Sequence, residues 1–151
     1  MLANEELRCQ EIEQSKKSSK NKQQLINARN GHGKYRTNLS NVENRCRVTG
    51  ITDKKFLTAS HIKPWRYCND SECLDGHNGL WLAPHIDRLF DRGWISFSSR
   101  GNLLCRNDRV RETLEQWGVE PNTSIGKLSD TQIRYMKYHN EEIFKNASSK
   151  K

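Results

Sequence analysis

The chain has 151 residues, of which 26 are Lys or Arg and 18 are Asp or Glu, so its formal net charge at pH 7 is +8. This length allows one compact domain with additional helices and excludes two full hydrophobic cores. The hydrophobic fraction of 33% is low for a wholly globular chain, which predicts that one part of the chain packs loosely.

The excess of positive charge favours nucleic acid as a partner, because its field concentrates phosphate groups around the protein. From charge alone, the alternative is a solvated surface with a basic tail. No run of about 18 apolar residues and no signal-peptide pattern occurs, and the five cysteines lack a disulfide-like spacing. We therefore expect a soluble cytoplasmic protein in a reducing compartment, with no membrane partner.

The chain divides into three predicted segments. Residues 1–28 are expected to form a helical or flexible basic N-terminal segment or linker, because Gln14 to Gln24 contains only Gln, Ser, Lys and Asn. Residues 29–120 are expected to form the main domain, and residues 121–151 a C-terminal capping helix with a basic tail. Residues 2–12 suit the end of a helix from a missing domain, so we expect either a fragment of a longer protein or a small free-standing one.

The main domain opens with a basic segment that contains glycine. Arg29, Lys34 and Arg36 lie in this segment together with Gly31 and Gly33. A flexible glycine loop with such cations suits a clamp on a nucleic-acid backbone, with a plain exposed loop as the alternative.

The centre of the chain predicts strand, loop, strand and helix. Residues 55–59 are an apolar, β-prone run that places His61 near the end of a strand, and residues 62–77 read as a loop. Residues 79–82 are the returning strand. Pro84 marks the first turn of a helix that ends at Gly93.

The remaining elements surround this unit. Residues 94–97 and 102–105 flank a turn and predict a β-hairpin. A helix is expected from about Asp108, and Ser129 with Gln132 forms a capping box for a last helix. Tyr135, Tyr138 and His139 are expected to pack or to lie at the surface.

The polar residues that punctuate these elements resemble those of the HNH endonucleases. The matching string is Cys46-Arg47-Val48-Thr49-Gly50, Ala59-Ser60-His61-Ile62-Lys63-Pro64-Trp65, Asn78-Gly79-Leu80 and Leu89-Phe90-Asp91-Arg92-Gly93-Trp94-Ile95-Ser96-Phe97. It resembles the branch in which Ser-His-Ile replaces Asp-His-Ile. The resemblance implies an α+β fold with a ββα-metal core, here with an added β-hairpin and flanking helices. Residues 29–120 would then be the nuclease domain, and a missing N-terminal domain would supply specificity.

The resemblance also implies roles for two polar residues of the core. His61 would be the general base that deprotonates water, since a histidine with a pKa of about 6.5 suits this task at neutral pH. Asn78 would hold the loop and thereby orient the base. The alternatives are a structural histidine at a strand end and a turn asparagine before Gly79.

Metal ligands are expected on the helix after the second strand. The third HNH position falls on Asp87, a hard oxygen ligand that suits one Mg²⁺ or Mn²⁺ ion, with Asp91 assisting from the next turn. His85 would be a ligand or a phosphate donor, but it lies about 200° around the helix from Asp87, so both can bind one ion only if the first turn is irregular. Ser60 stands where many relatives have a stronger ligand. Structural Zn²⁺ is not expected, because the chain has no C-x-x-C pair.

The function predicted from these residues is metal-dependent hydrolysis of phosphodiester bonds in DNA, in a restriction-like or mobile-element-like nuclease. Lys63, Arg66, Arg88 and Arg92 flank the string and could bind phosphates on either side of the scissile bond. Double-strand cleavage would require a homodimer or a second visit. The alternative function is a non-catalytic nucleic-acid-binding module on the same scaffold, which Ser60 motivates.

Overall fold

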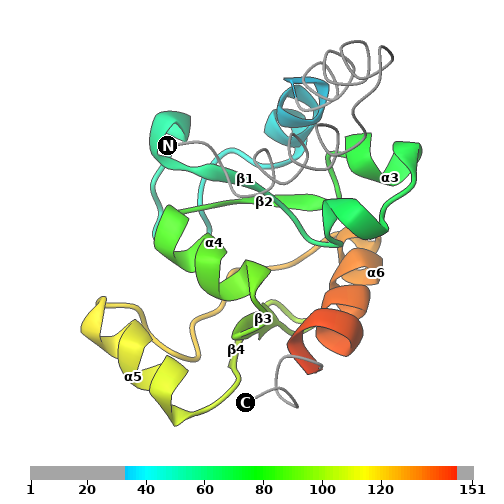
Figure 1. The fold of residues 1–151 in the computed structure, drawn as a ribbon. Helices are drawn as coiled ribbons and strands as arrows, with labels where there is room; N and C mark the ends of the chain where they lie inside the picture. Colours follow the sequence, from blue (N-terminus) through cyan, green and yellow to red (C-terminus); the bar gives the residue numbers. More distant parts are fainter. Residues whose placement is uncertain (1–32, 146–151) are drawn as a thin grey trace, which may run out of the picture.

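The computed structural model describes residues 33–145, which form two antiparallel hairpins surrounded by helices (Figure 1). In chain order the elements are a helix over residues 33–42, the 3-10 turn η1 (Lys54–Phe56), strand β1 (Thr58–His61), the 3-10 turn η2 (Trp65–Tyr67), helix α3 (Asp70–Leu74), strand β2 (Gly79–Leu82), helix α4 (Pro84–Asp91), strands β3 (Ile95–Phe97) and β4 (Leu103–Cys105), helices α5 (Asp108–Gln116) and α6 (Asp130–Tyr138), and the π-helical turn η3 (His139–Phe144). The predicted α+β class is confirmed. The predictions for residues 1–28 and for Arg29 lie outside the described residues.

The first hairpin and the helix after it form the predicted ββα unit. β1 pairs antiparallel with β2 in a register that sets His61 opposite Gly79. Every residue of both strands is buried, and α4 packs against β1. Pro84 occupies the first turn of α4, and Gly93, with a φ of +75°, lets the chain leave the helix. His61 therefore stands at the end of a buried strand, as predicted.

The second hairpin is also confirmed. β3 pairs with β4, with Phe97 opposite Leu103. Gly101 turns the chain between them with a φ of +84°, and a Cβ atom there would lie 2.1 Å from the carbonyl oxygen of Gly126. Figure 1 shows α4 between the two hairpins, and α4 contacts both β1 and β3.

The C-terminal helices begin where the sequence predicts. The Asn107 side chain accepts a hydrogen bond from the backbone nitrogen of Val110 at 3.1 Å and caps α5. Ser129 and Gln132 form the predicted capping box of α6. One hydrophobic core runs from Tyr35 to Met136, so α5 and α6 pack on the same core as the ββα unit. Among the helices described, none combines the length and apolar character that a membrane span needs.

The prediction that residues 62–77 form a loop is wrong, because this segment contains η2 and α3. Asn69 accepts a hydrogen bond from the backbone nitrogen of Glu72 at 2.8 Å, and the Glu72 carboxylate accepts one from the backbone nitrogen of Asn69 at 3.0 Å. This reciprocal capping box starts a helix of only five residues. The strand predicted from Lys55 is likewise displaced, since Asp53 caps η1 and the strand begins at Thr58.

The glycine-bearing basic segment is not a flexible loop where it is described. Residues 33–42 are helical, and this helix buries Tyr35 and Leu39, which lie four residues apart on one face. Burial of these two side chains outweighs the low helix propensity of Gly33. Lys34 stays exposed at the start of the helix.

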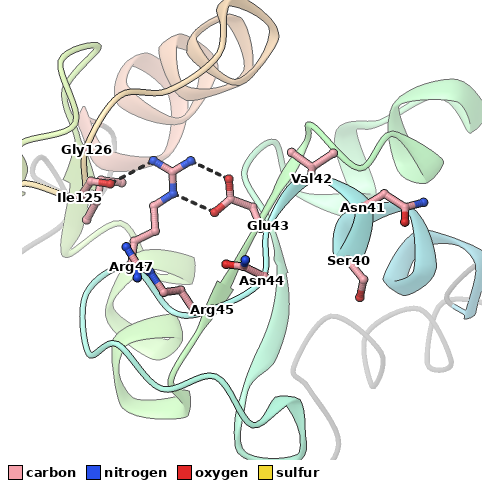
Figure 2. A pocket seen from close by; sticks show the side chains of 9 residues that line it. All are labelled: Ser40, Asn41, Val42, Glu43, Asn44, Arg45, Arg47, Ile125 and Gly126. Carbon is pink, nitrogen blue, oxygen red and sulfur yellow. Dashed lines mark hydrogen bonds and ion pairs between the residues drawn. The ribbon is translucent and has the colours of Figure 1, made fainter.

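A buried ion pair joins the end of this helix to the C-terminal part of the fold (Figure 2). The Arg47 guanidinium donates to both carboxylate oxygens of Glu43, at 2.7 and 2.6 Å. Its remaining nitrogen, Nη1, donates to the carbonyl oxygens of Ile125 and Lys127, at 2.9 and 2.8 Å. The Gln132 side chain completes the set by donating to Glu43 at 3.0 Å. The guanidinium of Arg47 lines a hollow of about 500 Å³. All of its nitrogens donate to oxygen atoms of the protein.

His139 is buried where η3 packs against α4 and β3. Its Nε2 donates to the carbonyl oxygen of Phe90 at 2.8 Å, and its ring stacks on the Phe90 ring at 3.9 Å between centroids. Its Nδ1 lies 2.7 Å from the Ser96 hydroxyl, which also accepts a hydrogen bond from Asn140. Burial lowers the pKa of His139 to about 4, so the ring is neutral in the folded protein.

We expect this histidine to make the protein sensitive to acid. The unfolded chain takes up a proton on His139 at about pH 6.5 and the folded protein only at about pH 4, so the free energy of unfolding should fall by about 3 kcal/mol across that window. Urea denaturation at pH 7, 5.5 and 4 measures this loss. His139→Gln should be less stable at pH 7 and lose less on acidification, whereas His77→Gln, at an exposed position, should keep the acid dependence. An unchanged acid loss in His139→Gln would contradict the assignment.

Candidate functional site

His61 is held on three sides by the protein. Only 3% of its surface is exposed. Its ring stacks on that of Tyr35, with centroids 3.8 Å apart and planes inclined by 12°, and Trp65 meets it more nearly edge-on at 6.1 Å. Its Nε2 lies 2.9 Å from the carbonyl oxygen of Cys73 in α3. The imidazole therefore has one fixed orientation.

The Cys73 contact also selects the tautomer of His61. A carbonyl oxygen only accepts hydrogen bonds, so Nε2 carries the hydrogen in this contact. In the neutral ring, Nδ1 then carries the lone pair and is the nitrogen that can take up a proton. A backbone carbonyl in this position is the kind of partner that fixes which nitrogen of a histidine acts.

Tyr35 connects the helix over residues 33–42 to both strands of the first hairpin. Its hydroxyl lies 3.0 Å from the carbonyl oxygen of Ser60 and 3.2 Å from that of Asn78, and donates to them. A Cβ atom on Gly79 would lie 2.0 Å from the Tyr35 hydroxyl oxygen, so only glycine leaves room for this contact. The tyrosine thus braces the ends of β1 and β2 next to His61.

Asn78 is fully buried and ties both ends of the segment between the strands. Its Oδ1 accepts a hydrogen bond from the backbone nitrogen of Lys63 at 2.8 Å. Its Nδ2 lies near three acceptors: the carbonyl oxygens of Lys63 at 3.3 Å and Glu72 at 3.2 Å, and the Cys68 sulfur at 3.4 Å. A single amide therefore holds the start of the segment against α3.

The last carbonyls of α3 all receive side chains from outside the helix. Glu72 accepts from Asn78, Cys73 from His61, and the Leu74 oxygen from Asn38 Nδ2 at 2.7 Å. A helix end leaves its last carbonyls without the usual intrahelical partners, and among the described residues only Glu72 of these three also accepts from a backbone nitrogen, that of Asp75 at 3.3 Å. Asn78 and His61 thus bind adjacent carbonyls, so the position of Asn78 and the orientation of the imidazole depend on one short helix.

The structure places the predicted phosphate-binding residues in different surroundings. The Lys63 ammonium lies 3.0 Å from the Glu72 carboxylate, whose hydrogen bond raises the pKa of the lysine, and 5.0 Å from the Tyr138 ring. Arg36 lies 5.1 Å from the Trp81 ring, and Arg66 lies 4.9 Å from that of Tyr67. The exposed members of the set are Lys34, Arg66, Arg88 and Arg92.

The predicted metal ligands all come from α4, but His85 does not share a face with Asp87 and Asp91. The first turn is regular, because the backbone nitrogen of Asp87 donates to the carbonyl oxygen of Ala83 at 2.8 Å. The condition for His85 and Asp87 to bind one ion is therefore not met. His85 instead packs nearly perpendicular to the Trp117 ring at 4.7 Å, and burial lowers its pKa.

The carboxylates of Asp87 and Asp91 remain as oxygen donors on α4. Asp87 is 3% exposed, and Asp91 lies one turn later and is partly exposed. Within residues 33–145, no group of three or more His, Cys, Asp or Glu side chains is gathered as a metal cluster. Two carboxylates nevertheless suit Mg²⁺, which is commonly bound by one or two of them together with water and substrate phosphate.

Sequence reasoning missed two parts of this site. The glycines around Tyr35 predict a loop, whereas the helical spacing of Tyr35, Leu39 and Val42 in a polar segment is the signal for a packed helix. The Cys73 carbonyl is a backbone group that every residue has, so the residue type does not indicate its role. The pair Asn69 and Glu72, spaced as a capping box, was the available signal for α3.

One family model matches the central part of the chain. Residues 46–98 match the family model described as HNH endonuclease. The matched segment contains β1, β2, α4 and β3, and with them His61, Asn78 and Asp87. It confirms the family that the sequence predicted for this region. A comparison with curated proteins gave no match.

Proposed function

We propose that the HNH endonuclease domain in this chain hydrolyses phosphodiester bonds in DNA with His61 as general base and one divalent cation. The observation that carries the proposal is the hydrogen bond between His61 Nε2 and the Cys73 carbonyl, which leaves Nδ1 as the basic nitrogen. The family match and the net charge of +8 support DNA as the substrate.

Hydrolysis requires a water molecule that loses its proton as it attacks phosphorus. His61 Nδ1 would take up this proton, and the Cys73 carbonyl would stabilise the imidazolium that forms, since Nε2 keeps its hydrogen. The stack on Tyr35 and the bonds of Asn78 would keep the ring from turning during this step. Orientation of this kind accounts for much of what a general base contributes.

Asp87 would hold the cation, with Asp91 assisting, because both offer the hard oxygen atoms that Mg²⁺ and Mn²⁺ prefer. When bound, the cation supplies positive charge to the phosphate oxygens as negative charge builds up on them. His85 is the least suitable of the three as a ligand of this cation, because its ring packs on Trp117. Arg66, Arg88 and Arg92 are the exposed cations best suited to phosphate contacts, while Lys63 is paired with Glu72.

Supercoiled plasmid tests the proposal. The chain should convert it to nicked or linear DNA with Mg²⁺ or Mn²⁺ and not with EDTA, and His61→Ala should cut about 10²- to 10⁴-fold more slowly while still binding DNA. His77→Ala is the matched control, because this neighbouring imidazole is exposed. Cutting by His61→Ala at the wild-type rate would overturn the assignment of the base. DNA binding without cutting under either ion would favour a non-catalytic module.

A further inference from the structure

A second surface, distant in sequence from the base, has the composition of a nucleotide-binding groove. It lies between α4, the residue before β3, and α5 with the residues just before it, and has a volume of about 580 Å³, within the roughly 300–1,000 Å³ of typical ligand sites. Its lining includes Arg88, Arg106, Arg109, Trp94 and Trp117. Three guanidinium groups and no carboxylate line it, so the groove suits an anion.

Two of these guanidinium groups are open to a ligand, and the third has a polar atom without a partner. Arg88 and Arg109 are exposed. The Nε atom of Arg106 is buried and has no hydrogen-bond partner among the residues that the structure describes. Arg47 in the hollow of Figure 2 differs, because its nitrogens are occupied by Glu43 and two backbone carbonyls. A buried donor without a partner costs free energy, which an anionic ligand would recover.

The two tryptophans give the groove an aromatic surface as well. Trp94 is 36% exposed and Trp117 is 42% exposed, although burial of a tryptophan is strongly favourable. The perpendicular contact with His85 holds the Trp117 ring in place. Aromatic rings beside arginines form the stacking platforms on which single-stranded nucleic acid binds.

We propose that this groove binds an unpaired stretch of a DNA strand, with bases stacked on Trp117 and Trp94 and phosphates on the three arginines. The identification of the ligand as DNA rests on the proposed function. Bases within a duplex are stacked on one another and do not present a free face to a tryptophan. The groove therefore directs the enzyme toward DNA with a single-stranded region, such as an overhang, a flap or a bubble.

Binding in the His61→Ala background tests the groove without cleavage. Fluorescence anisotropy at 150 mM salt would compare a labelled dT12 strand with a blunt duplex hairpin. Trp117→Ala and Arg106→Gln should each weaken binding of dT12 by at least about fivefold and of the duplex by less than about twofold. Trp117→Phe keeps an aromatic face and should stay within about twofold of the parent. Arg100→Gln, an exposed arginine on the β3–β4 turn, is the matched control for loss of one charge.

Several outcomes would overturn the inference. One is that Trp117→Ala and Arg106→Gln bind dT12 with the same affinity as the parent or as Arg100→Gln. Another is a loss confined to the duplex, and a third is equally tight, groove-dependent binding of poly-glutamate, which would indicate an acidic protein partner. A wild-type chain that binds dT12 through the groove but cuts no plasmid would sink the proposed function and leave the groove standing.

Discussion

Asn78→Ala is expected to lower the free energy of unfolding by about 3–5 kcal/mol and to abolish measurable cleavage. The substitution leaves the backbone nitrogen of Lys63 and the carbonyl oxygen of Glu72 without their hydrogen bonds to the side chain of a fully buried residue. It also removes one of the three side chains that hold α3, whose Cys73 carbonyl orients the imidazole of His61. Stability and activity should therefore fall together. Urea denaturation and plasmid cleavage measure the two losses.

The design must separate loss of folding from loss of orientation. Asn78→Asp keeps an acceptor for the Lys63 nitrogen but places a carboxylate oxygen against two carbonyls at a fully buried position, so it should lose stability as well. At a temperature where both variants are folded, the cleavage rate should still be reduced. Asn122→Ala, at an exposed position, should change neither quantity. Wild-type stability and cleavage in Asn78→Ala would refute the role.

The ββα unit was predictable because its signals are local. Pro84 at the first turn of α4 and Gly93 after its end each act within a few residues of themselves, as does the capping box at Ser129 for α6. A short segment of sequence is enough to read such signals. The second hairpin follows from two apolar runs around a turn that contains Gly101.

α3 and the helix over residues 33–42 were missed because distant contacts stabilise them. A helix of five residues is marginal by itself, and α3 forms where Asn38, His61 and Asn78 bind its last carbonyls. Tyr35 reaches acceptors 25 and 43 residues away. No local pattern contains that information.

The same division applies to the candidate site. His61 and Asn78 were identifiable as residue types in a particular order, whereas the backbone carbonyl that selects the histidine tautomer was not. Helical geometry predicts that the side chains of His85 and Asp87 point in different directions if the first turn of α4 is regular. The first turn is regular. The contact that His85 makes instead, with Trp117 of α5, depends on tertiary packing.

Gly79→Ala should be among the most damaging changes to the fold, at about 3 kcal/mol or more. Its Cβ atom would lie 2.0 Å from the Tyr35 hydroxyl oxygen, 3.0 Å from Tyr35 Cζ and 3.1 Å from Leu39 Cδ1. Both side chains are fully buried, so neither can move aside into solvent. Because Gly79 pairs with His61 in the hairpin, relief of the clash would also displace the base from Tyr35.

A double-mutant cycle identifies the source of this loss. Tyr35→Phe removes the nearest atom of the clash, so Gly79→Ala should cost about 1 kcal/mol less in that background than in the wild type, as measured by urea denaturation. Gly33→Ala is the matched control, since a Cβ atom at that helical position meets nothing within 4 Å and should be neutral or stabilising by up to about 1 kcal/mol. Equal costs of Gly79→Ala in both backgrounds would mean that the hydroxyl is not the obstacle. A smaller cost in Tyr35→Phe would show that the close approach of Tyr35 to the hairpin requires glycine at position 79.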